Sequence, residues 1–261
     1  MTDLVHQFIA RGAHVQGDRP ALLFRDAVLS YAQVWDLVSN AANGLLAQGL
    51  CAAERVAIYL PKQPETVVGI FATAAAGGCF VPVNPRHSQA RILVTSAQRL
   101  QQLAAELPDC SDLHTLVLVD TLSGERREAL ARDLPGLTII DWQDLLEATP
   151  LPRHRRIDTD MTALLYTSGS TGNPKGVVLS HRNMVAGARS VAEYLENTPE
   201  DRLLAVLPLS FDAGLSQVTT AFSVGASVVL MDYLLPRDVL KAVARYEVTG
   251  LAAVPPLWNQ L

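Results

Sequence analysis

The sequence is poor in cysteine and in charge of either sign. Its 261 residues include three cysteines and 18% charged residues, and the net charge is −5. Three cysteines without a C-x-x-C pair indicate neither a disulfide framework nor a structural zinc site. The six histidines form neither an H-x-x-x-H nor an H-E-x-x-H pattern, so they do not indicate a metal site. A weakly acidic chain lacks the broad basic surface of a nucleic-acid-binding protein.

Targeting segments and long apolar runs are also missing. The N-terminus carries Asp3 and has no apolar core before a small-residue cleavage site, so it does not predict a signal peptide. The longest uncharged stretch, residues 66–84, nearly reaches the roughly 20 residues of a membrane span. Gly77, Gly78 and Pro82 interrupt it. We therefore expect a cytoplasmic protein without a membrane span.

Apolar residues make up 49% of the chain, which is enough for a large buried core in one large domain or two small ones. Residues 22–24 and 28–31 flank a charged pair and predict a short hairpin. Ser30 is expected to cap a helix whose apolar positions recur at three and four residues, and Gly49 is expected to end that helix.

The next stretch predicts the fold class. Residues 55–60, 65–76 and 79–83 predict a strand, a helix and a strand, an order that favours an α/β fold with layered, parallel-rich sheets and helices on both faces. Another strand is predicted at residues 91–95, only seven residues later. A parallel crossover needs roughly 10–12 residues. These two strands are therefore not expected to be adjacent parallel neighbours. They lie in different sheets, pair antiparallel, or have a missing segment between them.

The middle of the chain is less informative. The pattern predicts a helix at residues 97–107 and strands at residues 115–120 and 138–141. Residues 124–133 are highly charged and are expected to be solvated. The basic run at residues 153–156 is interpreted as a solvated connection rather than as a binding patch.

The most informative stretch lies between two apolar strand candidates, residues 163–166 and 177–179. It combines hydroxyls, glycines and one lysine, in the order Thr167, Ser168, Gly169, Ser170, Thr171, Gly172, Asn173, Pro174 and Lys175. The glycines allow successive backbone N–H groups to point into one concavity, and Lys175 adds a mobile positive charge. These donors predict a cradle for a polyphosphate. A flexible linker would need no lysine at a fixed position, and a Walker A loop would open a helix instead of a strand.

The loop at residues 165–177 closely resembles the signature loop of AMP-forming, adenylate-forming enzymes, which include acyl-CoA synthetases, luciferases and the adenylation domains of peptide synthetases. Further matches follow in the family's order, at residues 59–61, 74–85, 180–183, 207–214 and 254–256. Residues 1–261 therefore resemble a partial N-terminal AMP-binding domain with its phosphate loop at residues 166–176. Residues 206–217 and 251–260 are similar to acyl-CoA ligases associated with exosortase systems.

This resemblance implies an activity. A small carboxylic acid would be activated with ATP and Mg²⁺, and the acyl group would pass to the thiol of coenzyme A or of the phosphopantetheine on an acyl carrier protein. The loop would hold the ATP phosphates through Thr167, Ser168, Gly169, Ser170, Thr171, Gly172 and Lys175. Thr167 and Lys175 would act in catalysis, and Thr167 would also lie at the magnesium ion. Phe211, Asp212 and Gly214 would border the carboxylate substrate.

Two interpretations of Asp212 stay open. In amino-acid-activating relatives an aspartate at this position binds the amino group of the substrate, and a carboxylate beyond a strand end can pair with an ammonium group. Asp212 can instead cap a helix that starts near Ala213, and we expect this capping role. The apolar face that follows is expected to be mostly core.

The family's remaining parts would lie beyond Leu261. They are an acidic magnesium ligand, an adenine-binding stretch, a ribose-binding aspartate and a mobile C-terminal domain with a catalytic lysine. We therefore expect the 261-residue chain alone to be an incomplete and inactive portion of an acyl-CoA ligase, without its C-terminal domain. Two alternatives stay open. One is an amino-acid-adenylating domain of the peptide-synthetase type, and the other is a non-catalytic module that binds a nucleotide or a partner protein.

Overall fold

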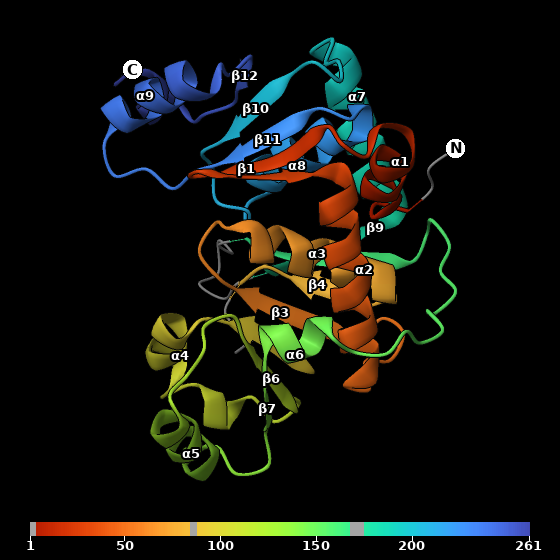
Figure 1. Cartoon of the computed structure of the whole chain (residues 1–261), viewed down its shortest axis with the longest axis vertical. Helices are drawn as coiled ribbons and strands as arrows, with labels where there is room; N and C mark the ends of the chain where they lie inside the picture. Colours follow the sequence, from red (N-terminus) through yellow and green to blue (C-terminus); the bar gives the residue numbers. More distant parts are fainter. Residues whose placement is uncertain (1–3, 84–87, 168–174) are drawn as a thin grey trace.

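The computed structural model describes residues 4–83, 88–167 and 175–261, and these residues form two sheets with helices around them (Figure 1). Sheet A has five strands in the order β12-β10-β11-β1-β2, and sheet B has seven in the order β7-β6-β5-β3-β4-β8-β9. Neighbouring strands are parallel except in the pairs β1–β2 and β8–β9. The α/β prediction with parallel-rich sheets is confirmed.

The strands are short, and several are buried throughout. Sheet A consists of β1 (Pro20–Phe24), β2 (Ala27–Ser30), β10 (Arg202–Ala205), β11 (Ser227–Leu230) and β12 (Gly250–Leu251). Sheet B consists of β3 (Arg55–Tyr59), β4 (Cys79–Val81), β5 (Ile92–Thr95), β6 (Thr115–Leu118), β7 (Thr138–Asp141), β8 (Met161–Thr167) and β9 (Lys175–Ser180).

Helices lie between the two sheets and on their outer faces. They are α1 (Gln7–Gln16), α2 (Tyr31–Ala47), α3 (Pro64–Ala76), α4 (Ala97–Leu103), α5 (Gly124–Asp133), α6 (Trp142–Leu146), α7 (His181–Tyr194), α8 (Asp212–Val224), α9 (Pro236–Tyr246) and α10 (Pro255–Trp258). Within the described ranges, no helix is both long enough and apolar enough to cross a membrane. The uncharged stretch from residue 66 instead forms α3 and then the buried strand β4, as its glycines indicate.

The central core joins the two sheets. Helix α3 packs on β3 and β4, and α8 packs on β10 and β11. The rings of Phe71 in α3 and Phe222 in α8 meet edge to face at 5.4 Å, and Tyr31 of α2 contacts Phe222 at 5.8 Å. Smaller clusters beneath α4 and α9 cover the other faces, with Leu93 and Val229 fully buried or nearly so. Helices therefore lie on both faces of the sheets, as predicted.

Local sequence signals account for helix α2. The Ser30 side chain accepts a hydrogen bond from the Gln33 N–H at 3.3 Å, and the Gln33 side chain accepts one from the Ser30 N–H at 2.8 Å. This reciprocal capping box satisfies two N–H groups that the first helical turn leaves free. After the helix, Gly49 has a φ of +79°, which a residue without a Cβ adopts at little cost. The predicted start and end of α2 are confirmed.

The short link after β4 has an explanation that the sequence analysis did not consider. Strands β4 and β5 are both parallel to β3 and lie on its two sides, with Phe80 and Ile92 both in register with Val56. They are thus not adjacent neighbours, as predicted. They share one sheet and are not antiparallel, so both of those alternatives are wrong. Residues 84–87 of the link lie outside the described residues. On its return the chain bonds to β3, since the Arg91 N–H donates to the Arg55 carbonyl at 2.8 Å.

Two predictions for the middle of the chain need correction. Helix α4 ends at Leu103, and a separate 3-10 turn follows at Leu107–Asp109. The basic run is only in part a solvated connection, because Arg155 is exposed but the other three side chains contact the protein. The Arg153 guanidinium lies 5.4 Å from the centre of the Trp35 ring, and a ring nitrogen of His154 is 2.9 Å from the Leu50 carbonyl oxygen. The side chain of Arg156 is only 13% exposed and pairs with Asp160 at 3.3 Å.

Candidate functional site

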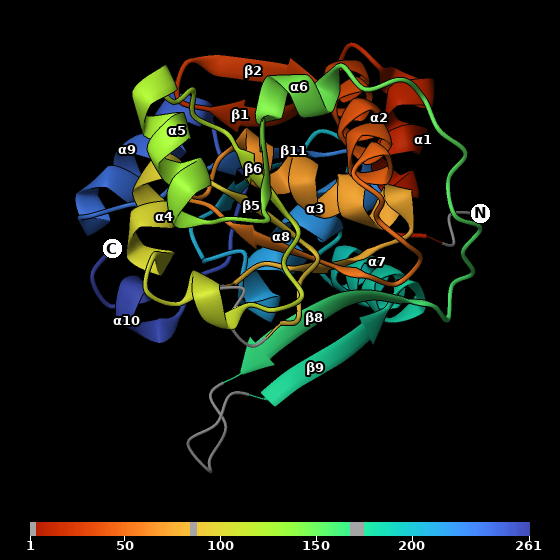
Figure 2. The ribbon, with the colours of Figure 1, turned by 90° about the horizontal axis from the view of Figure 1, so that it is seen from below.

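The two ends of the predicted phosphate loop lie side by side. Thr167 is the last residue of β8, Lys175 is the first residue of β9, and the two are partners in the antiparallel ladder. The Thr167 hydroxyl donates to the Lys175 carbonyl oxygen at 3.5 Å. Both residues are exposed at the end of this hairpin where the connecting loop is attached, and the hairpin projects from sheet B in Figure 2. The Lys175 amine and the Thr167 hydroxyl can therefore reach one ligand.

The loop itself belongs to the part of the chain that the structure leaves undescribed. Ser168, Gly169, Ser170, Thr171 and Gly172 all lie outside the described residues. Their assignment to the phosphates stays a prediction from the sequence. The structure contributes the position at which the loop is attached.

Strand β9 differs from the prediction. The apolar run at residues 177–179 suggested a buried strand, but β9 is the edge strand of sheet B, and Val177 and Val178 are 44% and 59% exposed. A continuous apolar run of three residues does not distinguish an edge strand from a central one. The exit of β9 is nevertheless fixed. The Ser180 side chain accepts from the Asn183 N–H at 3.2 Å, and the Asn183 side chain accepts from the Ser180 N–H at 3.0 Å, a capping box that starts α7.

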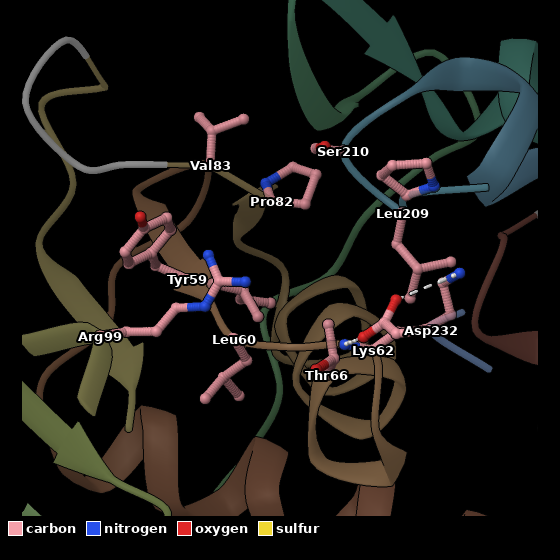
Figure 3. Close-up of a pocket in the computed structure, with 12 residues that line it drawn as sticks. Tyr59, Leu60, Lys62, Thr66, Pro82, Val83, Arg99, Leu209, Ser210 and Asp232 are labelled. Atoms are coloured by element: carbon pink, nitrogen blue, oxygen red, sulfur yellow. Dashed lines mark hydrogen bonds and ion pairs between the residues drawn. The ribbon is translucent and has the colours of Figure 1, made fainter. Parts of the chain in front are cut away.

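A cavity of about 360 Å³ opens beyond the ends of β3 and β4 (Figure 3). Tyr59 and Leu60 from the end of β3, Val83 after β4 and Arg99 of α4 line one side, and Ser210 from the segment after β10 lines the other. Strand β3 leads to β4 on one side, whereas β5 leads to β6 on the other. Ligands of open parallel sheets bind where strand connections diverge in this way. The topology therefore accounts for the position of the cavity.

The hairpin and this cavity lie at the same edge of sheet B. Strands β3, β4 and β8 are parallel and adjacent in that order, so their carboxyl ends share one edge. At roughly 4.8 Å between neighbouring strands, β8 lies about 10 Å from β3. The phosphate loop emerges from the end of β8, and the cavity opens at the ends of β3 and β4. One ligand can thus span a loop at Thr167 and a group in the cavity.

The three predicted substrate-binding residues lie at the start of α8 but differ in their surroundings. Phe211 is 65% exposed and lines a second cavity of about 510 Å³ together with Leu207, Tyr233 and Val254. Its ring is therefore available to a ligand. Asp212 is exposed to solvent beside it.

Asp212 does not cap the helix. It is the first residue of α8, the capping position belongs to Phe211, and no side-chain cap hydrogen bond forms there. The capping prediction is wrong by one residue, a shift that sequence patterns do not resolve at helix ends. Asp212 still lies in the first turn, where a negative charge is favoured by the helix dipole.

Gly214 is buried because a backbone passes close to it. A Cβ at this position would lie 2.1 Å from the Pro208 carbonyl oxygen. The absence of a side chain therefore allows the segment before Phe211 to fold back onto α8. This packing is a sufficient reason for a glycine here, whether or not a substrate also approaches it.

The sequence analysis missed Lys62 and Asp232. The Lys62 side chain is only 3% exposed, and its ammonium donates to the carbonyl oxygens of Ala205 and Met231, each at 2.8 Å. The Asp232 carboxylate lies 3.6 Å from the ammonium and accepts from the Lys62 N–H at 3.2 Å. Burial lowers the pKa of the Lys62 amine to about 8, against the attraction of Asp232. With only three lysines in the chain, a lysine directly before a helix was the available signal.

Comparisons with known proteins agree with this geometry. The family model described as AMP-binding enzyme matches residues 9–261. The chain belongs to the AMP-binding enzyme family. The predicted resemblance to adenylate-forming enzymes is confirmed.

Proteins similar to this AMP-binding chain include synthases, which match in sequence, and CoA ligases, which match in structure. Phenyloxazoline synthase MbtB of Mycobacterium tuberculosis is 32% identical over 97% of the chain, and surfactin synthase subunit 2 of Bacillus subtilis is 28% identical over 98%. Among solved structures, the anthranilate CoA ligase AuaEII in complex with anthranoyl-AMP superposes with a TM-score of 0.87 at 21% identity over 100% of the chain. The long-chain-fatty-acid-CoA ligase FadD1 of Archaeoglobus fulgidus gives 0.84 at 19% over 98%.

The chain spans only part of each of these proteins. It covers 17% of MbtB and 52% of each of the two ligases. The ligase structures confirm the fold, which is that of the N-terminal region of adenylate-forming enzymes. At 21% and 19% identity they show the fold alone and do not show which acid the chain serves.

Proposed function

We propose that this chain supplies the ATP phosphate site and the carboxylate site of an enzyme that activates a carboxylic acid as an acyl-adenylate. A carboxylate oxygen of the acid attacks the α-phosphorus of ATP, and pyrophosphate leaves. The acyl group then passes to the thiol of coenzyme A, which displaces AMP. The observation that carries this proposal is the shared edge of sheet B, where the Thr167–Lys175 hairpin and the cavity beyond β3 and β4 lie together.

The residues present fit the phosphates of ATP. The Thr167 hydroxyl and the Lys175 ammonium are exposed at the hairpin end and supply a neutral donor and a positive charge. Groups positioned in advance stabilise charge that grows on phosphate oxygens during the transfer. Phe211, which lines the adjoining cavity, would pack against the acid near its carboxylate.

A magnesium ion would accompany the ATP. The described residues contain no group of three or more metal-ligating His, Cys, Asp or Glu side chains. Magnesium commonly keeps several waters and binds substrate phosphates with only one or two protein ligands. The Thr167 hydroxyl would be the ligand from this part of the chain.

Amino-acid adenylation is a second candidate, because the synthases MbtB and surfactin synthase subunit 2 share 32% and 28% identity with the chain. In that function the exposed Asp212 would bind the ammonium group of the substrate, and a carrier phosphopantetheine would accept the acyl group. The association with exosortase systems, the cytoplasmic location and an acyl carrier protein as partner also remain proposals from the sequence.

One substrate panel separates these candidates. The whole protein that the gene encodes is incubated with ATP, Mg²⁺, labelled pyrophosphate and separate fatty, aromatic and amino acids. We expect exchange of pyrophosphate into ATP with acids that lack an α-amino group, followed by thioester formation with coenzyme A. Exchange with amino acids alone would favour the second candidate. ATP binding without exchange for any acid would indicate a non-catalytic module.

A further inference from the structure

Lys62 connects two sheets at their carboxyl ends. Only Leu60 and Pro61 separate it from the end of β3 in sheet B, yet both carbonyl groups that it binds lie at the ends of strands of sheet A. Ala205 is the last residue of β10, and Met231 comes directly after β11. The loop that carries Lys62 is itself held in place, because the Thr66 hydroxyl donates to the Pro61 carbonyl oxygen at 2.5 Å. We call Lys62 and its acceptors Ala205, Met231 and Asp232 the clasp.

The two strand ends in the clasp lead into the walls of the Phe211 cavity. Val206 and Leu207 follow Ala205 and form one wall, and Asp232 and Tyr233 follow Met231 and line the cavity as well. The ladder between β10 and β11 sets the spacing of these walls, since Ala205 is in register with Leu230. The two hydrogen bonds from the ammonium tie both walls to the loop that follows β3.

The clasp also lies between several cavities. Lys62 and Asp232 line the cavity of about 360 Å³ beside Arg99, and they line a further cavity of about 580 Å³ beneath α9. Asp232 lines the Phe211 cavity too. Figure 3 shows the Lys62 side chain directed at Asp232 at the boundary of the first cavity. A change in the clasp therefore alters the cavity walls on more than one side.

A buried ammonium is an unfavourable choice if stability alone is considered. Burial lowers its pKa to about 8 because it disfavours the charged form relative to water, and the amine stays mostly protonated at pH 7. Apolar residues of similar volume often replace buried charged groups without loss of stability. A lysine adds directional hydrogen bonds, since its ammonium holds one carbonyl oxygen at the end of β10 and one after β11, each at 2.8 Å.

We propose that Lys62 is a positioning residue that sets the walls of the Phe211 cavity relative to sheet B, and so aligns the acid with the phosphate hairpin. This inference rests on the proposed function. Lys62 acts here through the two backbone carbonyls that its ammonium holds. Attack on phosphorus requires a defined approach, and a misplacement of about 1 Å can lower a rate about 100-fold.

The test compares two lysine-to-methionine variants of the whole encoded protein. Lys62→Met keeps a four-atom side-chain stem and removes the ammonium that binds the carbonyls of Ala205 and Met231. Lys241→Met makes the same change at an exposed lysine of α9 that has no hydrogen bond or ion pair among the described contacts. Three quantities are measured: kcat and KM for pyrophosphate exchange, the midpoint of thermal unfolding, and backbone hydrogen exchange by peptide.

We expect Lys62→Met to lower kcat about 100-fold, as for a misplacement of about 1 Å, with the KM for ATP unchanged because the hairpin belongs to sheet B. Hydrogen exchange should rise in residues 206–211 and 231–233 and stay at the wild-type level in α2 and β6. Lys241→Met should match the wild type in all three measurements. If Lys62→Met does not fold, Asp232→Asn replaces it, because its side chain is 64% exposed. The same peptides should then respond more weakly.

Two results would overturn the proposal. One is a wild-type kcat in Lys62→Met together with wild-type hydrogen exchange at residues 206–211. The other is a rise in hydrogen exchange throughout the chain together with a lower midpoint of thermal unfolding, which would show a purely structural role. A wild-type protein that exchanges no pyrophosphate with any acid would refute the proposed function instead, and the peptide data would still decide whether the clasp positions the cavity walls.

Discussion

Thr167 and Lys175 face each other across the last described pair of the β8–β9 hairpin, with the Thr167 hydroxyl 3.5 Å from the Lys175 carbonyl oxygen. The antiparallel ladder holds a hydroxyl and an ammonium at one end of sheet B. Both side chains are exposed, and their position is therefore available for phosphate.

Replacement of Lys175 tests this arrangement. Lys175→Ala removes a charge-assisted contact to phosphate worth roughly 1.5–3 kcal/mol, so pyrophosphate exchange should fall by about one to two orders of magnitude. Lys241→Ala, on α9, is the control with an equal change of charge. Exchange at the wild-type rate in Lys175→Ala would contradict the assignment of this lysine to the phosphates.

Replacing either of two helical glycines with alanine should change the free energy of unfolding, in opposite directions for the two sites. In Gly214→Ala the new Cβ would lie 2.1 Å from the Pro208 carbonyl oxygen, and the backbone must shift. We expect a loss of roughly 1–3 kcal/mol in the free energy of unfolding. Gly187 of α7 is exposed, and no atom beyond the adjacent backbone of its own helix lies within 4 Å of the place that a Cβ would occupy. Gly187→Ala should therefore gain about 0.5–1 kcal/mol from helix propensity. Urea unfolding of both variants measures the two signs.

Asp212 should matter little for stability. It makes no capping hydrogen bond, so Asp212→Ala removes only an interaction with the helix dipole, worth less than about 1 kcal/mol. Ser30→Ala breaks a true capping box and should cost about 1 kcal/mol or more. Thermal unfolding compares the two. In the substrate panel, a loss confined to amino acids in Asp212→Ala would support amino-acid adenylation.

A buried histidine pair predicts acid sensitivity. His6 and His181 lie edge to face with ring centres 6.0 Å apart, and the Val5 N–H donates to His181 Nδ1 at 3.2 Å. That bond needs an unprotonated Nδ1. Burial lowers the pKa of His6 to about 3, with His181 and Arg153 adding repulsion, and lowers the pKa of His181 to about 4.

The number of protons bound in each state gives the direction of the pH dependence. Below pH 6.5 the histidines bind protons in the unfolded state but not in the folded state, so the free energy of unfolding falls as the pH falls. This fall ends when the pH reaches the folded-state pKa values of about 4 and 3. Between pH 7 and pH 5 we expect a loss of about 2 kcal/mol for each histidine. Unfolding of His181→Asn should depend less on pH over this range, whereas His14→Gln, at an exposed histidine, should keep the wild-type slope. Parallel slopes in all three proteins would refute this account.

The sequence by itself determined the local elements. Ser30 marks the start of α2 because a side-chain oxygen can satisfy the free N–H groups of the first turn, and Gly49 marks its end because it tolerates a positive φ. Periodicity located the strands of the α/β fold, and the composition of the loop before Lys175 indicated phosphate and the family. All of these signals depend on neighbours in the chain.

Only the tertiary structure decided which strands are neighbours and which side chains meet. The order β5-β3-β4 places one strand on each side of β3. The short link excluded β4 and β5 as adjacent neighbours, but it did not predict that β3 lies between them. It also brought Lys62 to Ala205, 143 positions further along the chain, and placed Arg153 on Trp35. Such contacts are set by the packing of two sheets around α3 and α8, and packing acts on distances in space, which no local pattern of residues encodes.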